Sequence, residues 1–272
     1  WNSMLYAEGT LRNDWSSTLS KSTRSYLYPS VSGSFVVSEL LPKYKWLSLW
    51  KLRGSWTSSK TPAGIYDINQ VYNINNNVWG NMTSASLPTT IYSSDVFPES
   101  SSTWEIGTAI NLYNNRVSAD IAYYNKRMYD FLEEASITPA TGYYSSYVNT
   151  DEEITRKGVE ITLNGTPVKT NDWQWNISVN WSKFARYYTQ LDSIYTPDKP
   201  WIKVGERVDA FVLYDFQYDP EGNIIHSNGE PQFSDYPSKW GNYDPDWIWG
   251  VNTTLKYKNW NFSVSFDGRV GG

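Results

Sequence analysis

The stretch "DWQWNISVNWSK", residues 172–183, alternates strictly between two kinds of side chain. Amides and hydroxyls hold the even positions from Gln174 to Ser182. Strict alternation over this length predicts a β-strand with one apolar and one polar face. It leaves open which face meets the solvent, because a soluble protein would bury the tryptophans and a membrane barrel would turn them toward lipid. Apolar residues hold the odd positions: Trp173, Trp175, Ile177, Val179 and Trp181.

The composition excludes several classes of protein. The chain has 272 residues, a net charge of −5 and no cysteine, so disulfides and thiolate metal sites are excluded. Basic residues form no stripe, which argues against a nucleic acid partner. No apolar run approaches the ~18 residues that a transmembrane helix needs. A membrane barrel stays possible, because it carries its lipid-facing residues at alternate positions only.

Strand-like stretches recur along the whole chain, and helical periodicity is almost absent. The sequence therefore predicts an all-β protein. The nine predicted strands cover residues 3–14, 28–39, 48–58, 103–113, 116–128, 155–166, 172–186, 245–257 and 259–268.

The connections between these strands alternate in length. Short links follow every second strand, at 40–47, Asn114-Asn115, 167–171 and Lys258-Asn259. Long links follow the others, at 15–27, 59–102, 129–154 and 187–244. Loops of more than about 40 residues are uncommon in compact soluble domains. Short turns on one side and long loops on the other are typical of an outer-membrane barrel, so we predict an antiparallel transmembrane β-barrel, of which this chain supplies about nine strands.

Aromatic residues gather near strand ends, as in the interfacial girdles of membrane barrels. The alternative is a soluble carbohydrate-binding β-domain with the same rings in its core. Under the barrel hypothesis, the residues expected to face lipid are Trp104, Trp173, Trp175, Trp181, Trp247, Trp249, Trp260 and Phe262. Those expected to line the lumen are Asn176, Ser178, Asn180, Asn261, Ser263, Ser265 and Asp267.

The sequence offers no catalytic site, and we predict that the chain is not an enzyme and needs no cofactor. His226 is the only histidine and lies in the polar stretch "GNIIHSNGE", which is typical of a surface loop. The acidic run Asp151-Glu152-Glu153 offers carboxylates to a calcium ion, but such runs are more often solvated. We therefore predict no metal site.

Aromatic residues in the long loops are candidates for contact with a ligand or a covering partner. Flat rings stack on sugars and grip peptides, although they also pack loops against each other. The candidates are Tyr66, Tyr72, Trp79, Tyr92, Tyr143, Tyr144, Tyr147, Trp201 and Tyr236.

Several segments, taken in order, resemble the C-terminal barrel of the SusC/RagA family of TonB-dependent outer-membrane transporters. The resemblance is weaker in 59–102 and 225–243, and Trp15 stands where the family more often has a small residue. The segments that carry it are "TLRNDWSS" (10–17), "YPSVSGSFVVSE" (28–39), "WLSLWKLRGSW" (46–56), "STWEIGTAINLYNNRVSADIAYYNKRMYDFL" (102–132), "RKGVEITLNGTPVKTNDWQWNISVNWS" (156–182), "VGERVDAFVLYDFQYDPEGNI" (204–224) and "DPDWIWGVNTTLKYKNWNFSVSFDGRVGG" (244–272).

The resemblance implies both a place and a function. Residues 1–272 would form part of the C-terminal barrel of a longer chain, with the plug domain and the remaining strands outside this sequence. The implied activity is TonB-dependent import of oligosaccharides or oligopeptides across the bacterial outer membrane. The implied partners are a SusD-like surface lipoprotein, TonB acting through the N-terminal region, and outer-membrane lipid. The loops at 59–102 and 187–244 are expected to touch ligand or lid. A non-transporting barrel or adhesin stays open as an alternative.

Overall fold

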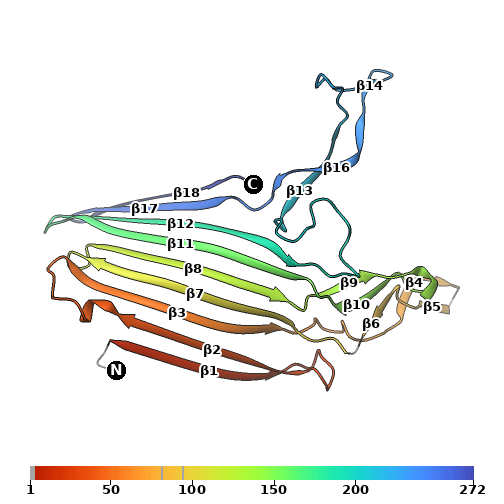
Figure 1. Ribbon diagram of the computed structural model, residues 1–272, viewed down its shortest axis with the longest axis horizontal. Coiled ribbons are helices and arrows are strands. Elements are labelled where there is room, and N and C mark those ends of the chain that lie inside the picture. Colours follow the sequence, from red (N-terminus) through yellow and green to blue (C-terminus); the bar gives the residue numbers. More distant parts are fainter. Residues whose placement is uncertain (1–3, 81, 94) are drawn as a thin grey trace.

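The computed structural model describes residues 4–80, 82–93 and 95–272, without the side chains of 76–79. Its main element is a nine-stranded antiparallel sheet whose spatial order follows the chain (Figure 1). Each of the nine predicted strands is present in this sheet. The strands are β1 Leu5–Trp15, β2 Ser25–Val36, β3 Leu47–Thr61, β7 Glu99–Leu112, β8 Val117–Tyr129, β11 Glu153–Lys169, β12 Trp173–Gln190, β17 Trp247–Tyr257 and β18 Trp260–Val270.

Short and long connections lie at opposite ends of the sheet, as predicted (Figure 1). The short links are 37–46, 113–116, 170–172 and 258–259, and the long ones are 16–24, 62–98, 130–152 and 191–246. We call these the turn end and the loop end. The turn after β7 contains Asn114 and Asn115 at φ 56° and 63°. Asparagine tolerates this left-handed region, so the pair supports a tight reversal.

Several strands run further than the sequence indicated, and β11 does so past a proline. The predicted strand stops at 166, one residue before Pro167, which cannot donate a backbone hydrogen bond. Instead β11 continues to Lys169, with a register shift between Gly165 and Val168 that takes Pro167 out of the ladder. β2 is displaced toward the N-terminus relative to the predicted strand 28–39. It spans Ser25–Val36 and is followed by the 3₁₀ helix η1, Val37–Glu39.

The long loops contain short strands that the sequence analysis missed. A three-stranded sheet unites two loops, and a two-stranded arm projects from a third (Figure 1). The second 3₁₀ helix, η2, covers Pro139–Thr141, and no helix in the described ranges has the length and apolar character to span a membrane. The short strands are β4 Asn73–Trp79, β5 Met82–Ser86, β6 Thr90–Tyr92, β9 Leu132–Ser136, β10 Ser145–Asn149, β13 Ala210–Phe216, β14 His226–Ser227, β15 Glu230–Pro231 and β16 Phe233–Asn242.

The register separates apolar and polar residues onto the two faces of the main sheet. Directly opposed residues of an antiparallel pair point to the same side. Val179 on β12 is opposite Leu163 and Val251. One residue away, Ser178 is opposite Asn164 and Asn252. The alternation of the opening stretch therefore extends across neighbouring strands, and we call the two sides the apolar face and the polar face.

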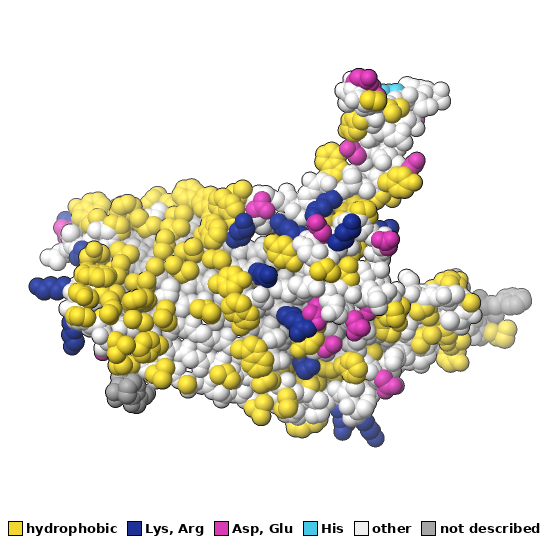
Figure 2. All heavy atoms as spheres, viewed as in Figure 1, with side chains coloured by type: hydrophobic (Ala, Val, Ile, Leu, Met, Phe, Trp, Pro, Cys, Tyr) yellow, Lys and Arg dark blue, Asp and Glu magenta, His cyan; other side chains and the backbone are white. Residues whose placement is uncertain are grey.

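Among the residues that the structure describes, the main sheet is a single layer without a second sheet packed on its apolar face. Among the described residues, no large side chain is fully buried, and the small core of Leu19, Tyr26, Ala63 and Val96 lies at the loop end. On central strand β7, Ile106 is 60% exposed. In Figure 2, hydrophobic side chains spread over the strands, with Lys and Arg at the turn end and both Lys/Arg and Asp/Glu toward the loop end. Within the described part of this chain, no protein covers the face that carries the tryptophans, which is expected of the barrel and not of a soluble domain with its tryptophans inside.

Candidate functional site

The seven residues predicted to line a lumen share the polar face. Asn176, Ser178 and Asn180 project from β12, and their rows continue through β17 to Ser263, Ser265 and Asp267 on β18. Asn261 completes the set opposite Lys256. The amide oxygen of Asn176 accepts from Thr166 Oγ1 at 3.0 Å, and that of Asn180 accepts from Thr162 Oγ1 at 3.1 Å. These cross-strand bonds join β11 and β12 on the polar face.

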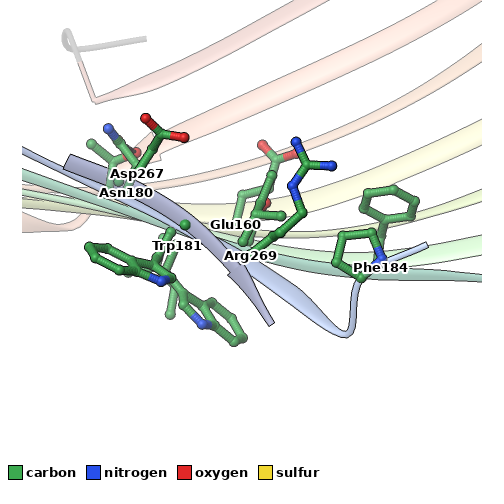
Figure 3. A pocket seen from close by; sticks show the side chains of 14 residues that line it. Glu160, Asn180, Trp181, Phe184, Asp267 and Arg269 are labelled. Atoms are coloured by element: carbon green, nitrogen blue, oxygen red, sulfur yellow. Dashed lines mark hydrogen bonds between the residues drawn. The ribbon is translucent and has the colours of Figure 1, made fainter. Parts of the chain in front are cut away.

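A shallow hollow of about 640 Å³ lies around the loop-end half of these rows (Figure 3). Glu160, Asn180, Asp267 and Arg269 contribute polar groups to its lining. Figure 3 shows Trp181 on the other side of the ribbon from Asn180 and Asp267. The hollow therefore combines carboxylate, amide and guanidinium groups, which suit hydrogen bonding to a polar solute.

An ion-pair cluster that the sequence analysis missed joins three strands on the polar face. Arg53 on β3 donates to both carboxylate oxygens of Asp120 on β8, at 2.7 and 2.8 Å. Its Nε reaches Glu105 on β7 at 3.4 Å. The guanidinium lies over Gly107, where a Cβ would stand 2.7 Å from Arg53 Cζ. Arg53 and Asp120 are 67 residues apart, so only the strand order brings them together.

The residues predicted to face lipid share the apolar face, with aromatic clusters toward both ends. At the turn end the rings of Trp173 and Tyr257 lie 4.2 Å apart, and Trp175 Nε1 donates to Thr253 at 2.8 Å. Toward the loop end, the Trp104 ring lies 5.3 Å from Tyr123. The remaining members, Trp181, Trp247, Trp249, Trp260 and Phe262, fall on the same face by register.

Some of the loop aromatics are brought together and others are not. Tyr66 and Tyr92 line one hollow of about 310 Å³ beside Asp67, and the ring of Tyr147 lies 6.0 Å from that of Tyr92. Tyr144 is exposed nearby, and its N–H donates to Thr89 O. The partly exposed Tyr143 and the exposed Tyr72 do not line this hollow, and the side chain of Trp79 lies outside the described residues.

The other two loop aromatics belong to residues 191–246. Tyr236 is 80% exposed on β16, part of an arm that stands away from the main sheet (Figure 1). Trp201 is partly buried in the stretch before the arm. Consequently Tyr66, Tyr92 and Tyr147 gather on the joined loops 62–98 and 130–152, whereas Tyr236 stands apart on the arm.

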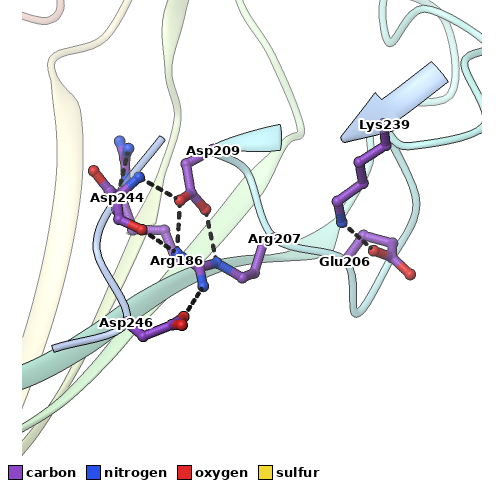
Figure 4. A network of polar contacts seen from close by, with 7 residues as sticks. All are labelled: Arg186, Glu206, Arg207, Asp209, Lys239, Asp244 and Asp246. Carbon is purple, nitrogen blue, oxygen red and sulfur yellow. Dashed lines mark hydrogen bonds and ion pairs between the residues drawn. The ribbon is translucent and has the colours of Figure 1, made fainter. Parts of the chain in front are cut away.

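A polar network fixes the base of the arm (Figure 4). Arg207 forms a two-point pair with Asp209, at 2.7 and 3.0 Å, and reaches Asp246 at 3.3 Å. Arg186 on β12 donates to Asp244 Oδ2 at 3.0 Å. Burial alone would raise the pKa of Asp209, but the bonds from Arg207 and from the Asp244 N–H outweigh it and lower that pKa.

Carboxylates crowd the loop end near the predicted acidic run. Burial, and next the charges of Glu133 and Asp192, raise the pKa of Glu152 to about 7. Glu153 is paired with Arg127, and the Asp151 N–H donates to Asp192. Within the described ranges no three acidic or histidine groups lie close enough to hold a metal ion. His226 is exposed on β14, with Nδ1 2.9 Å from Ile224 O.

Comparison with known proteins shows to which family this architecture belongs. The family profile described as "TonB dependent receptor-like, beta-barrel" matches residues 1–270. The chain belongs to this TonB-dependent receptor β-barrel family. The predicted transmembrane barrel fold is thereby confirmed, the barrel is placed in the bacterial outer membrane, and the family is one of receptors rather than enzymes.

Individual relatives show that this receptor barrel is SusC/RagA-like, as the sequence resemblance indicated. TonB-dependent receptor SusC of Bacteroides thetaiotaomicron is 25% identical over 94% of the chain and 28% of its own length. TonB-dependent receptor P3 of Formosa agariphila is 23% identical over 97% of the chain and 30% of its length. The solved structure of the RagAB peptide transporter matches with a TM-score of 0.82 at 22% identity, over 98% of this chain and 32% of that one. The chain thus spans about 30% of its curated relatives.

Proposed function

We propose that this chain is part of the wall and outer loops of an importer that carries oligosaccharides or oligopeptides across the outer membrane. The observation that carries the proposal is the sheet itself, with an unpartnered apolar face, a polar face and loops gathered at one end, in a SusC/RagA-like receptor barrel. Barrels of about 22 strands with a plugged lumen are the outer-membrane transporters of this kind. We infer that a plug domain and further strands complete the wall.

The same proposal assigns an environment to each face of the main sheet. Trp104, Trp173 and the other residues of the apolar face meet lipid, because an exposed apolar face without protein cover is stable only in an apolar solvent. Asn176, Asp267 and the other residues of the polar face line the lumen. The aromatic hollow at Tyr66 and Tyr92 contacts the ligand at the outer end.

A surface lipoprotein of the SusD type is the proposed partner at the loop end, and TonB acts through the plug. The arm of β13 and β16 is the proposed contact with this lid, because it presents exposed rings such as Tyr214, Tyr236 and Trp240 on a ribbon fixed at its base. Exposed aromatic side chains are enriched in protein interfaces. SusC is one of the relatives that support the partnership.

The test is uptake by the bacterium that makes the full-length protein. We expect deletion of its gene to abolish growth on at least one oligosaccharide or oligopeptide as sole nutrient, and the intact gene to restore it. Deletion of TonB, or collapse of the proton gradient, should abolish uptake of the same nutrient. If the gene deletion leaves growth on every nutrient unaffected, or if uptake survives both the loss of TonB and the collapse of the proton gradient, the barrel is a non-transporting outer-membrane protein.

A further inference from the structure

Three cationic residues stand in a row on the polar face near the loop end. Arg156 on β11 is directly opposite Lys126 on β8 and Arg186 on β12. Neighbouring strands lie ~4.8 Å apart, so the Cα atoms of the three residues fall within about 10 Å. Arg156 is three residues inside the start of β11, where the chain enters from loop 130–152. We call Lys126, Arg156 and Arg186 the basic row.

Two members of the basic row have no anionic partner among the described residues. Arg186 pairs with Asp244, as described above. Within the described part of the chain, Lys126 and Arg156 form neither an ion pair nor a side-chain hydrogen bond, and Arg156 Nε is buried without an acceptor. Like charges directly opposed on a sheet are destabilising, and an unpaired guanidinium nitrogen adds the cost of lost hydration. An anion from outside this chain that bound the terminal nitrogens of the row would offset the repulsion between its like charges.

The Arg156 guanidinium is held by aromatic rings. Its Cζ lies 3.9 Å from the ring centroid of Phe184 and 5.8 Å from that of Tyr124. Both rings share one row of the polar face with Gly158, and a Cβ on Gly158 would overlap the Tyr124 ring. Stacking on aromatic faces leaves the edge of a guanidinium free to donate two parallel bonds to a carboxylate.

The surrounding acidic groups do not neutralise the row. Glu105, one row toward the turn end, is bound to Arg53. Glu160 lies four residues along β11 from Arg156, on the same face, and no ion pair joins them. Asp244 contacts Arg186 alone of the three cations. Among the described residues, Lys126 and Arg156 therefore remain without a carboxylate partner.

We propose that the basic row binds carboxylate groups of the imported oligomer, so that this importer selects acidic ligands. The inference rests on the proposed function, under which the polar face lines the lumen and the loop end is the entrance. A ligand entering from outside then meets the basic row before the uncharged stretch of Asn176, Ser178 and Asn180. Arg156 is the main recognition residue, and Lys126 and Arg186 add charge on either side.

The experiment measures binding to the purified full-length protein with two matched probe pairs. One pair is hexagalacturonate and its fully methyl-esterified form, and the other is a dodecapeptide with four aspartates and the same peptide with four asparagines. We expect one acidic member to bind at least tenfold more tightly than its neutral counterpart. The pair that discriminates identifies the carboxylate as belonging to a sugar or to a peptide.

Variants then locate the binding site. R156Q and K126Q should each weaken binding of the acidic probe about tenfold and leave the neutral probe unchanged, since charge-assisted bonds of ~1.5 kcal/mol correspond to this factor. K157Q is the matched control, because Lys157 neighbours Arg156 on β11 but points to the apolar face. Heat-modifiable electrophoretic mobility checks that every variant forms its barrel.

Four outcomes overturn the inference. They are failure of both acidic probes to bind at millimolar concentration, equal binding of charged and neutral members, equal losses in K157Q and R156Q, and a full-length structure in which the protein's own carboxylate occupies Arg156. TonB-dependent uptake of a neutral nutrient would refute this inference and leave the proposed function intact. Uptake independent of TonB would refute the proposed function whatever the probes show.

Discussion

Arg207 and Asp209 are two residues apart in the chain and form a two-point ion pair, with Nη2–Oδ2 at 2.7 Å and Nε–Oδ1 at 3.0 Å. Only 1% of the Asp209 side chain is exposed, and its carboxylate also accepts from the Asp244 N–H at 2.9 Å. The pair therefore connects the chain that enters β13 with the chain that leaves β16 and enters β17. We regard it as the clamp at the base of the arm.

Asp209→Asn should loosen the arm without unfolding the barrel. Removing one partner of a buried ion pair costs about 3 kcal/mol, because the other charge stays buried without compensation. We expect faster proteolysis and faster hydrogen exchange within 191–246, with the thermal transition of the barrel unchanged. Glu206→Gln is the control, since its exposed pair with Lys239 contributes about 1 kcal/mol or less.

The clamp should also be insensitive to mild acid. The pKa of Asp209 is lowered by folding, so its stabilising effect is present above the ordinary aspartate pKa and is lost only when pH falls below that value. Protease sensitivity of the arm should be the same from pH 8 to pH 5. Loosening of the arm at pH 5, or equal loosening by E206Q and D209N, would contradict the clamp.

A matched pair of lysine substitutions tests which face meets lipid. Val251 and Asn252 are neighbours near the middle of β17 and point to opposite faces. V251K should destabilise the full-length barrel by about 2–4 kcal/mol, the cost of a charge at mid-membrane, and N252K by less than about 1 kcal/mol. Unfolding in lipid vesicles measures both. The proposed orientation is reversed if N252K proves the more costly substitution.

The sequence predicted the main sheet because one rule governs it throughout. Alternation in stretches such as Trp173–Trp181 indicates that one face of the sheet is apolar and the other polar. The length of each link indicates at which end of the sheet that link lies. Neither signal depends on contacts distant in sequence. The strand ends were less accurate, as Pro167 shows, because a bulge moves the proline out of the ladder.

What the sequence could not predict depends on register. The pair of Arg53 with Asp120, and the row of Lys126, Arg156 and Arg186, need the exact pairing of strands that are far apart in the chain. The hairpin of β14 and β15 is different, because Asn228-Gly229, at φ 52° and 83°, is a recognised hairpin signal that we interpreted only as polar loop.

Glu152 should make the loop end more mobile as pH rises through neutrality. Folding raises its pKa to about 7, so the folded loop holds this proton more tightly than the open loop does. The resulting stability is full below the ordinary glutamate pKa and is lost as pH rises through about 7. Above that pH, ionised Glu152 repels Glu133 and Asp192, and Asp192 is the residue that binds the Asp151 N–H at 2.8 Å.

Hydrogen exchange of residues 150–152 and 191–195 should accordingly be slower at pH 5 than at pH 8, after correction for intrinsic rates. The difference is at most about 2 kcal/mol in opening free energy once solvent screening is allowed for. Glu152→Gln should abolish it, while Glu39→Gln, at the turn end, should leave it unchanged. A pH dependence that survives E152Q would assign the effect to another group.

Gly158→Ala should impair the basic row by displacing Tyr124. A Cβ at this position would overlap the Tyr124 ring, which lies at the end of a flexible side chain and can move away at a cost of about 1–3 kcal/mol. Arg156 would then lose one of its two aromatic contacts. We expect affinity for the acidic probe to fall about threefold to tenfold, with the barrel still assembled.

Gly165→Ala is the matched control on the same strand, because nothing lies within 4 Å of a Cβ added there. Its affinity for the acidic probe should equal that of the unmodified protein. The comparison separates a change in carboxylate recognition from a general effect of alanine on β11. If G165A weakens binding as much as G158A does, the position of the Tyr124 ring is irrelevant to binding, and the proposed role of this ring in orienting Arg156 is wrong.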